Sequence, residues 1–66
     1  MHIQLNGTAT DLPDALSARE LVERLELGGK RIALEVNGEI LPRSGYDRHR
    51  LKDGDRVEIV HAIGGG

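Results

Sequence analysis

The chain ends in Ile63-Gly64-Gly65-Gly66, and the group best placed for chemistry is the carboxylate of Gly66. Glycine has the smallest backbone cross-section and adopts positive φ without strain. Three glycines directly after an apolar strand therefore place a carboxylate on a thin arm, which suits insertion into the active site of another protein. Chain ends are often frayed, and one terminal glycine would indicate no more than fraying. Three glycines with no linker before them favour a functional arm.

Other side chains able to do chemistry are few and far apart. The three histidines, His2, His49 and His61, lack the spacing of metal ligands on a helix or hairpin. The turn Asp53-Gly54-Asp55 has residues that turns favour for backbone reasons, and it lacks the rest of a calcium loop. The chain has no cysteine, Ser17 is expected to cap a helix and Ser44 to lie in a loop, so a nucleophilic triad has no obvious members. A small domain also has little room for a pocket, which disfavours a standalone enzyme.

Length and composition further restrict the class of protein and the kinds of partner that we expect. A chain of 66 residues forms at most one domain. Tyr46 is the only aromatic residue, so the core must be aliphatic, and modules that stack nucleic-acid bases on aromatic rings are disfavoured. The net charge of −2 with no basic run predicts no nucleic-acid partner. No apolar run approaches the roughly 20 residues of a membrane span, and the first residues alternate unlike a signal peptide. We therefore expect a cytoplasmic protein without membrane contact.

The first half of the chain predicts a hairpin. Apolar and polar residues alternate over residues 1–5, which indicates a half-buried strand. Asn6-Gly7 is typical of a two-residue type I′ turn, and residues 8–12 return as a second strand. The pairs expected to share one face are Leu5 with Thr8, Ile3 with Thr10 and Met1 with Leu12.

A helix follows the hairpin. Ser17 is the expected N-cap, and Glu20 completes a capping box three residues later. We expect Gly28-Gly29 to end the helix, with glycine in the left-handed conformation. The apolar stripe of this helix is Ala18, Leu21, Val22 and Leu25.

The second half predicts three more strands. Residues 32–36 alternate, and Asn37-Gly38 marks a turn. A two-residue loop would turn Ile40 outward, so we expect a bulged three-residue loop that keeps Val36 and Ile40 on one face. The region between Pro42 and the last strand is irregular. Leu51 is its expected anchor in the core, and a turn over residues 52–55 precedes the strand 56–61, in which Val57 and Ile59 face inward and Glu58 and Val60 outward.

The order is ββαβββ, and packing one apolar helix face on one apolar sheet face gives a two-layer α+β domain. We expect a mixed sheet of four to five strands, with the first and last strands parallel at its centre. The expected domain spans residues 1–62, and residues 63–66 form a flexible C-terminal tail.

An apolar side chain on the open sheet face, next to the glycine tail, indicates a docking patch. Val60 is outward by alternation, and Ala62 and Ile63 continue from it. Single exposed aliphatic side chains are common and need no explanation, so it is the tail beside them that favours docking.

Several segments together resemble the ThiS family, the small sulfur carriers of thiamine thiazole biosynthesis, over essentially the whole chain. They are the strand opening at Met1, the segment Val36–Arg43, the segment Leu51–Val60 and the terminal Gly-Gly. The Asn-Gly-Glu-Ile-x-Pro-Arg part is the more discriminating, because the Asp-Gly-Asp turn and the Gly-Gly end also occur in longer MoaD-like carriers. Gly64 departs from many members, which carry another small residue there, but the terminal pair is intact.

The resemblance implies the β-grasp fold, as in ubiquitin, and a protein co-substrate rather than an enzyme, with no cofactor of its own. A ThiF-type adenylyltransferase would use Mg-ATP to convert the carboxylate of Gly66 to an acyl-adenylate. Sulfur from a cysteine desulfurase or other persulfide donor would then give a thiocarboxylate, which a ThiG-type thiazole synthase uses. Gly65 and Gly64 would be the stalk, and Val60, Ala62 and Ile63 the docking residues, with Arg43 and Arg56 as lesser candidates for rim contacts.

Two alternatives stay open. A MoaD-like carrier would serve molybdopterin synthesis or another sulfur pathway, and it would differ in its partners. A non-covalent β-grasp interaction module would bind through the sheet face around Val60, and truncation of its tail would be harmless.

Overall fold

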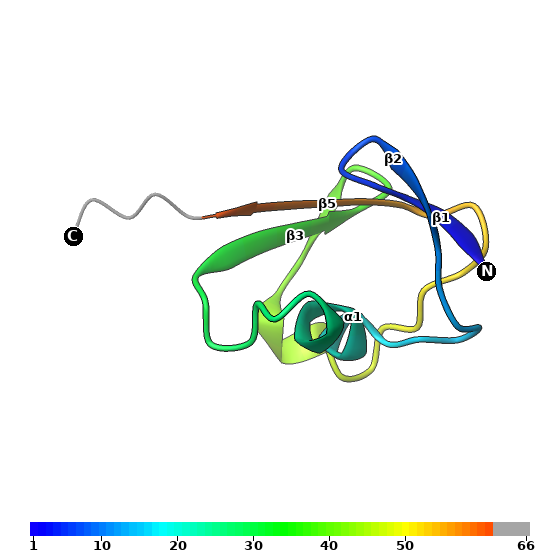
Figure 1. Cartoon of the computed structure of the whole chain (residues 1–66). Helices are drawn as coiled ribbons and strands as arrows, with labels where there is room; N and C mark the ends of the chain where they lie inside the picture. Colours follow the sequence, from blue (N-terminus) through cyan, green and yellow to red (C-terminus); the bar gives the residue numbers. More distant parts are fainter. Residues whose placement is uncertain (62–66) are drawn as a thin grey trace.

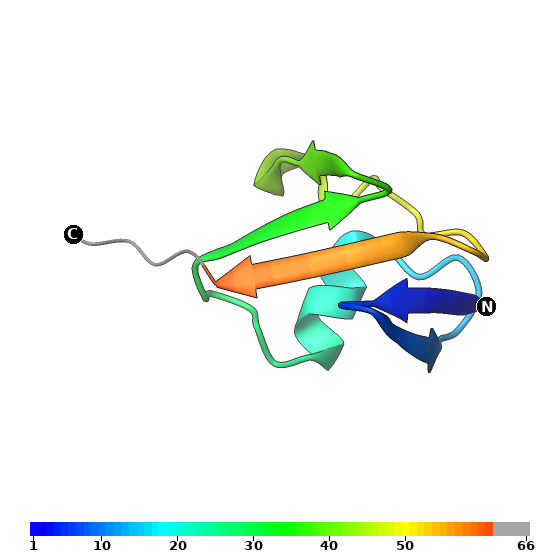
Figure 2. The same ribbon diagram turned by 90° about the horizontal axis from the view of Figure 1, so that it is seen from above.

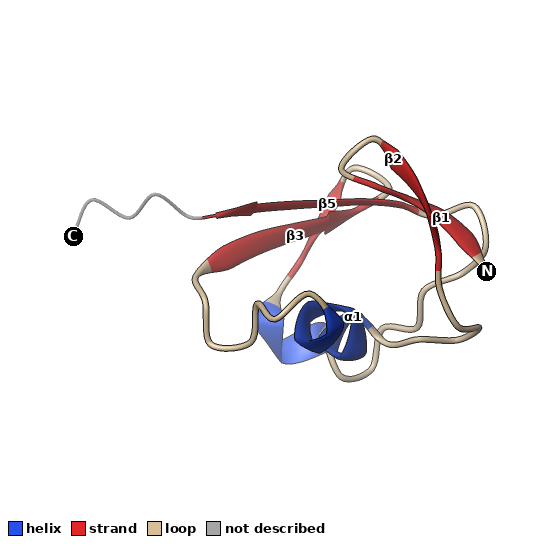
Figure 3. Cartoon of the chain, in the orientation of Figure 1, coloured by secondary structure: helices blue, strands red, loops and turns tan. Residues whose placement is uncertain are grey.

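A computed structural model describes residues 1–61, which form a sheet of five strands with one α-helix beneath it (Figures 1 and 3). The predicted end of the domain at residue 62 and the predicted tail over 63–66 lie outside the described residues. The elements are β1 (His2–Leu5), β2 (Thr8–Asp11), α1 (Ala18–Arg24), β3 (Ile32–Val36), β4 (Glu39–Leu41), the 3₁₀ helix η1 (Arg43–Gly45) and β5 (Arg56–His61).

The strands lie in the order β2-β1-β5-β3-β4, as the view from above shows (Figure 2). β1 and β5 are parallel neighbours, and the other adjacent strands are antiparallel. The predicted pairing of the first and last strands is therefore confirmed, with β5 at the centre. The two layers and the ββαβββ order are those of the α+β, β-grasp fold.

The first hairpin has the predicted register. Ile3 lies opposite Thr10 and Leu5 opposite Thr8. Asn6 (φ 50°) and Gly7 (φ 81°) both adopt positive φ. A type I′ turn requires this conformation at its two central residues, and its twist matches that of the flanking strands.

The second hairpin differs from the prediction, because its loop has two residues rather than a three-residue bulge. Val36 lies opposite Glu39, and Asn37 (φ 53°) and its following glycine both adopt positive φ. Ile40 consequently faces outward and is 71% exposed. Leu41 takes the inner position opposite Leu34, so the core is filled without Ile40.

Helix α1 begins as predicted. The Glu20 N–H donates to the Ser17 hydroxyl at 3.1 Å, and the Ser17 N–H donates to the Glu20 carboxylate at 3.0 Å. This reciprocal capping box satisfies backbone groups that otherwise lack partners at a helix start.

The end of α1 was predicted wrongly. The helix stops at Arg24, and the left-handed residue that ends it is Glu26 (φ 58°). Gly29 also has positive φ (79°), but it lies in the loop beyond the end of the helix. The Leu27 N–H donates to the Val22 carbonyl at 2.9 Å, and the Glu26 N–H to the Glu23 carbonyl at 3.0 Å. These two bonds form a Schellman motif. Leu25, assigned to the buried stripe, is instead 37% exposed, and Leu27 packs against the core.

The core lies between α1 and the inner face of the sheet. Its largest fully buried side chains are Leu21, Leu34, Leu51 and Val57. Leu51 is thus the predicted anchor of the irregular segment, and Tyr46 joins it at 7% exposure. None of the helices in residues 1–61 has the length and apolar character needed to cross a membrane.

Candidate functional site

The candidate site is at the end of β5, because the predicted reactive residues follow this strand in the sequence. Val60 lies on the open face of the sheet, as predicted, and is 56% exposed. It faces Ala33 across the β3–β5 ladder, and His61 faces Ile32. β5 ends on the side of the sheet away from the N-terminus (Figure 1). The other predicted site residues, Gly66, Gly65, Gly64, Ile63 and Ala62, lie outside the described residues.

The two turn asparagines hold the first half of β5 from both sides. The Asn6 N–H donates to the Val57 carbonyl at 2.9 Å, and the Ile59 N–H donates to Asn6 Oδ1 at 2.8 Å. The Asn37 N–H donates to the Arg56 carbonyl at 2.7 Å, and the Arg56 N–H donates to Asn37 Oδ1 at 2.9 Å. Each side chain therefore acts as a strand partner beyond its own turn, a role that the Asn-Gly pattern alone did not predict.

The two carboxylates of the Asp-Gly-Asp turn before β5 accept hydrogen bonds from neighbouring parts of the fold. Asp55 is 9% exposed, and its carboxylate accepts from the Lys52 N–H at 2.8 Å and from Asn37 Nδ2 at 3.0 Å. Asp53 accepts from the His2 N–H at 2.6 Å. Both carboxylates thus link the start of β5 to neighbouring elements. Among residues 1–61, no group of three or more His, Cys, Asp or Glu side chains is arranged to hold a metal ion.

The open face of the sheet carries exposed apolar side chains next to two carboxylates. Glu35 lies opposite Ile40 on β4 and opposite Glu58 on β5. Ala33 and Val60 form the next outward pair toward the end of β5. Three large apolar side chains of the described residues are exposed, and two of them, Ile40 and Val60, lie on this face. The exposure of Ile40 was not predicted, because it follows from the two-residue loop.

The two arginines proposed as rim contacts lie in different places. Arg56 is on the open face, opposite Gln4 of β1. Arg43 instead donates from its guanidinium to the Lys30 carbonyl at 3.0 Å, on the side of the sheet that α1 covers. The structure therefore does not bring Arg43 together with Val60 and Arg56.

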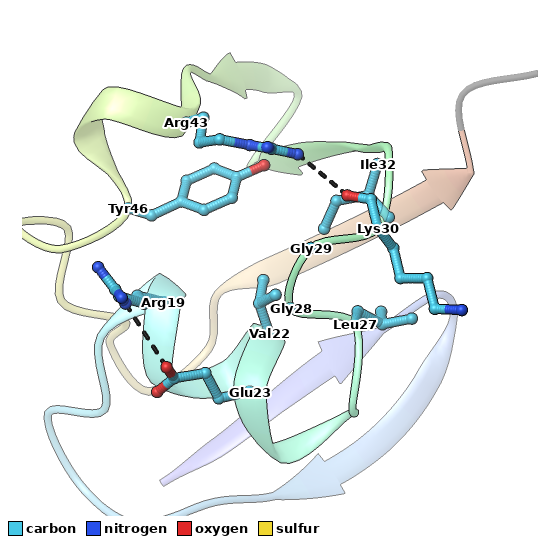
Figure 4. A pocket seen from close by; sticks show the side chains of 10 residues that line it. All are labelled: Arg19, Val22, Glu23, Leu27, Gly28, Gly29, Lys30, Ile32, Arg43 and Tyr46. Atoms are coloured by element: carbon cyan, nitrogen blue, oxygen red, sulfur yellow. Dashed lines mark hydrogen bonds and ion pairs between the residues drawn. The ribbon is translucent and has the colours of Figure 1, made fainter. Parts of the chain in front are cut away.

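Arg43 borders a hollow of about 250 Å³ between α1, the loop that follows it and η1 (Figure 4). Val22, Leu27, Ile32 and Tyr46 give this hollow an apolar lining, and charged side chains stand at its rim.

Two of the charged side chains at the rim of the hollow, Arg19 and Glu23, form ion pairs. Arg19 contacts Asp47 at 3.1 Å and Glu23 at 3.5 Å. The hydrogen bond to Asp47 is the main reason that the pKa of Arg19 is raised above its ordinary value. Among the described lining residues, Glu23 is the one carboxylate, and none is a serine, threonine, cysteine or histidine. The hollow therefore lacks a nucleophile with an adjacent base.

Comparison with known proteins agrees with the architecture and with the motifs. The model of the ThiS family matches residues 3–66. The chain is 32% identical over 66 residues to the sulfur carrier protein ThiS of Escherichia coli K12, covering 100% of both chains. It is 35% identical over 66 residues to a thiazole synthase of Paramagnetospirillum magneticum AMB-1, but there the match covers 20% of the relative.

A solved structure supports the same assignment. The crystal structure of the thiamine biosynthesis protein ThiS from Geobacter metallireducens superposes with a TM-score of 0.88 at 33% identity, covering 100% of each chain. The family match extends beyond β5 to the terminal glycines, and the structural match includes the whole fold. The chain therefore belongs to the ThiS family.

Proposed function

We propose that this chain is a sulfur carrier that supplies the sulfur of the thiazole ring in thiamine synthesis. The observation that carries the proposal is the family match through residue 66, which includes the terminal glycines. A full-length relative that bears the name of a sulfur carrier supports it. The chain would be a co-substrate of other enzymes, with Gly66 as its reacting residue.

The terminal carboxylate needs activation, because it is anionic, with a pKa near ~3.5, and is a poor electrophile. A ThiF-type adenylyltransferase would transfer AMP from Mg-ATP to the carboxylate of Gly66 and release pyrophosphate. The terminal sulfur of a persulfide then attacks the carbonyl carbon, and AMP leaves. Cleavage of the resulting S–S bond by a thiol gives the thiocarboxylate and a disulfide. The persulfide comes from a cysteine desulfurase or another donor.

The structure contributes to this chemistry by holding the strand that precedes the reacting residue. Asn6 and Asn37 hold the first half of β5 from two sides, and the pairing with β3 continues to His61, the last described residue. Gly64 and Gly65 would then cross into the partner's active site, because they carry no side chains to obstruct it. Mg-ATP belongs to the adenylyltransferase, and the carrier binds no cofactor of its own.

The acceptor of the sulfur in this proposal is a ThiG-type thiazole synthase. One relative with that name contains a segment 35% identical to this entire chain. The presence of a similar segment within a thiazole synthase supports a direct functional link between the two.

Deletion of Gly66 tests the proposal. The shortened chain should unfold at the same temperature as the full chain, because residues 1–61 contain the whole described core. It should support no thiazole formation when the adenylyltransferase, Mg-ATP, a persulfide donor and the thiazole synthase are supplied. Glu23→Gln, an exposed change on α1, is the control and should remain active. Thiazole formation by the deletion variant would overturn the proposal and favour a non-covalent module.

A further inference from the structure

The two hairpin turns contain the only asparagines of the chain, and glycine follows each of them, as Asn6-Gly7 and Asn37-Gly38. An Asn-Gly sequence is especially prone to deamidation, because glycine has no side chain to hinder attack of its backbone nitrogen on the asparagine amide carbon. A bond forms between these two atoms, the bond to the amide nitrogen breaks, and ammonia leaves with the proton of the glycine N–H. Water then opens the resulting succinimide ring and leaves aspartate or isoaspartate. The sulfur-carrier role makes no use of this chemistry.

The fold restrains both asparagines through their side-chain oxygens. The Ile59 N–H donates to Asn6 Oδ1 at 2.8 Å, and the Arg56 N–H donates to Asn37 Oδ1 at 2.9 Å. Ring closure requires the amide carbon to turn onto the nitrogen of the following glycine, so these bonds to β5 oppose it. We therefore expect the reaction mainly in molecules in which a hairpin has opened, because local opening frees side chains that the folded chain holds.

The two turns differ at the amide nitrogen. Asn37 Nδ2 donates to the Asp55 carboxylate at 3.0 Å, and Asp55 is 9% exposed. No Lys, Arg or His nitrogen of residues 1–61 lies within 4.0 Å of that carboxylate. Asn6 Nδ2, in contrast, donates to no carboxylate within the part of the chain that the structure describes.

This difference decides what deamidation does to the fold. The reaction replaces the amide nitrogen by oxygen and adds a negative charge. At Asn6, the aspartate that forms keeps an oxygen for the Ile59 N–H. At Asn37, the new carboxylate would stand against that of Asp55, and two carboxylates at hydrogen-bond distance repel each other when both are ionised. The second turn is therefore the one at which the reaction should alter the fold.

We propose that Asn37 is a deamidation site whose conversion to aspartate releases the start of β5 from the second hairpin. The inference is independent of the sulfur-carrier role, because it uses residues within the described fold and needs no partner. A chain that has reacted at Asn37 unfolds more easily, whereas a chain that has reacted at Asn6 keeps nearly its original stability. The second turn thereby sets a chemical lifetime for the folded protein.

Ageing of the full chain at mildly alkaline pH tests whether the reaction occurs. The intact mass should reveal molecules in which one NH₂ group is replaced by one OH group, and peptide mapping should locate the change at Asn37 and at Asn6. Both sites should react at least about 10-fold faster in concentrated urea than in buffer, because unfolding removes the bonds to β5. Gln4, the remaining side-chain amide of the chain, is the internal control and should stay unchanged.

Two matched variants mimic the products and test what each does to the fold. Asn37→Asp should lower the melting temperature by about 5–15 °C, because Asp55 loses a donor and gains a like charge. Asn6→Asp should lower it by no more than about 4 °C, since the acceptor for the Ile59 N–H remains. Combining Asn37→Asp with Asp55→Asn exchanges the carboxylate and the amide, and should recover most of the lost melting temperature. An Asn37→Asp chain that fails to fold alone, yet folds in this combination, supports the same conclusion.

Several outcomes would overturn the inference. An unchanged mass at Asn37 in the urea-unfolded chain would show that the reaction does not occur there, and equal rates in urea and in buffer would show that the fold does not restrain it. An equal fall in melting temperature for the two single variants, or no fall for Asn37→Asp, would remove the difference between the turns. A combination with Asp55→Asn that recovers nothing would place the damage in the turn itself rather than in the contact with Asp55.

Discussion

On the face of the sheet that α1 covers, Leu34 and Val57 lie opposite the helix with no exposed surface. On the other face, the residues that follow them in β3 and β5, Glu35 and Glu58, stand opposite each other without a cation within salt-bridge distance among the described residues. The covered face also contains the inward Leu41, whereas its neighbour Ile40 is 71% exposed on the open face.

This difference indicates that the two faces serve different purposes. Burial of apolar surface explains the covered face, because it is the dominant favourable term in folding. The open face has a like-charge pair and exposed aliphatic side chains, which contribute little to the stability of the isolated chain. Changes on the covered face should therefore alter stability, and changes on the open face should alter recognition.

The largest contrast in stability is expected between Leu34→Ala and Ile40→Ala. Leu34 is fully buried, so its truncation should lower the free energy of unfolding by about 2–5 kcal/mol. Ile40 is exposed, so its truncation should change that free energy by about 0.5 kcal/mol or less. Urea denaturation of both variants checks the pair. Similar losses would show that the open face also contributes to the core, and the comparison would fail.

A smaller loss of stability is expected from Asn37→Gly, which tests the hydrogen bonds at the start of β5 rather than either face of the sheet. Glycine keeps the positive φ of this turn position but removes the amide that bonds to the Arg56 N–H and to Asp55. We expect a loss of about 1–3 kcal/mol, because the buried Asp55 carboxylate and the Arg56 N–H each lose a hydrogen-bond partner. Thermal unfolding measures it. An unchanged melting temperature would mean that the strand ladder alone positions β5.

Ser17→Ala should have a moderate effect confined to the covered layer. It removes the hydroxyl that accepts from the Glu20 N–H, and loss of an N-cap typically costs about 1 kcal/mol. The free energy of unfolding should fall by that amount, while affinity for the adenylyltransferase stays unchanged. A parallel loss of affinity in the folded variant would mean that the helix side also takes part in recognition.

The smallest expected effect is the pH dependence that Glu20 contributes. The Ser17 backbone N–H, then its hydroxyl, and also Arg50 lower the pKa of Glu20 below its ordinary value of 4.5. The folded chain thus favours the ionised form, and this stabilisation is present above pH 4.5 and is lost as the pH falls through the lowered pKa. Glu20→Gln should flatten the fall in melting temperature on acidification. An identical acid profile for both proteins would contradict this assignment.

Local signals in the sequence predicted the elements that short-range chemistry determines. The register of the first hairpin, the capping box at Ser17 and the outward position of Val60 were all confirmed. The end of α1 was not, because no local rule favours Glu26 in the left-handed conformation. There the Schellman bonds and the packing of Leu27 on the core decide where the helix stops.

Local sequence patterns also failed to predict parts of the second hairpin and of the site. The turn preference of Asn37-Gly38 prevailed over the expected pairing of Val36 with Ile40, because Leu41 was available to fill the inner position. The bonds from the turn asparagines to β5 join residues far apart in the chain, as from Asn6 to Ile59, so no local pattern reveals them. The Glu35–Glu58 pair likewise depends on a register that appears only once β3 and β5 are aligned.

The most direct test of the account is the intact mass of the wild-type chain after incubation with the adenylyltransferase, Mg-ATP and a sulfur donor. The account predicts a mass gain equal to one oxygen replaced by one sulfur, located on Gly66 and absent when ATP is omitted. An unchanged mass, with an adenylyltransferase shown to be active on another carrier, would contradict the sulfur-carrier role.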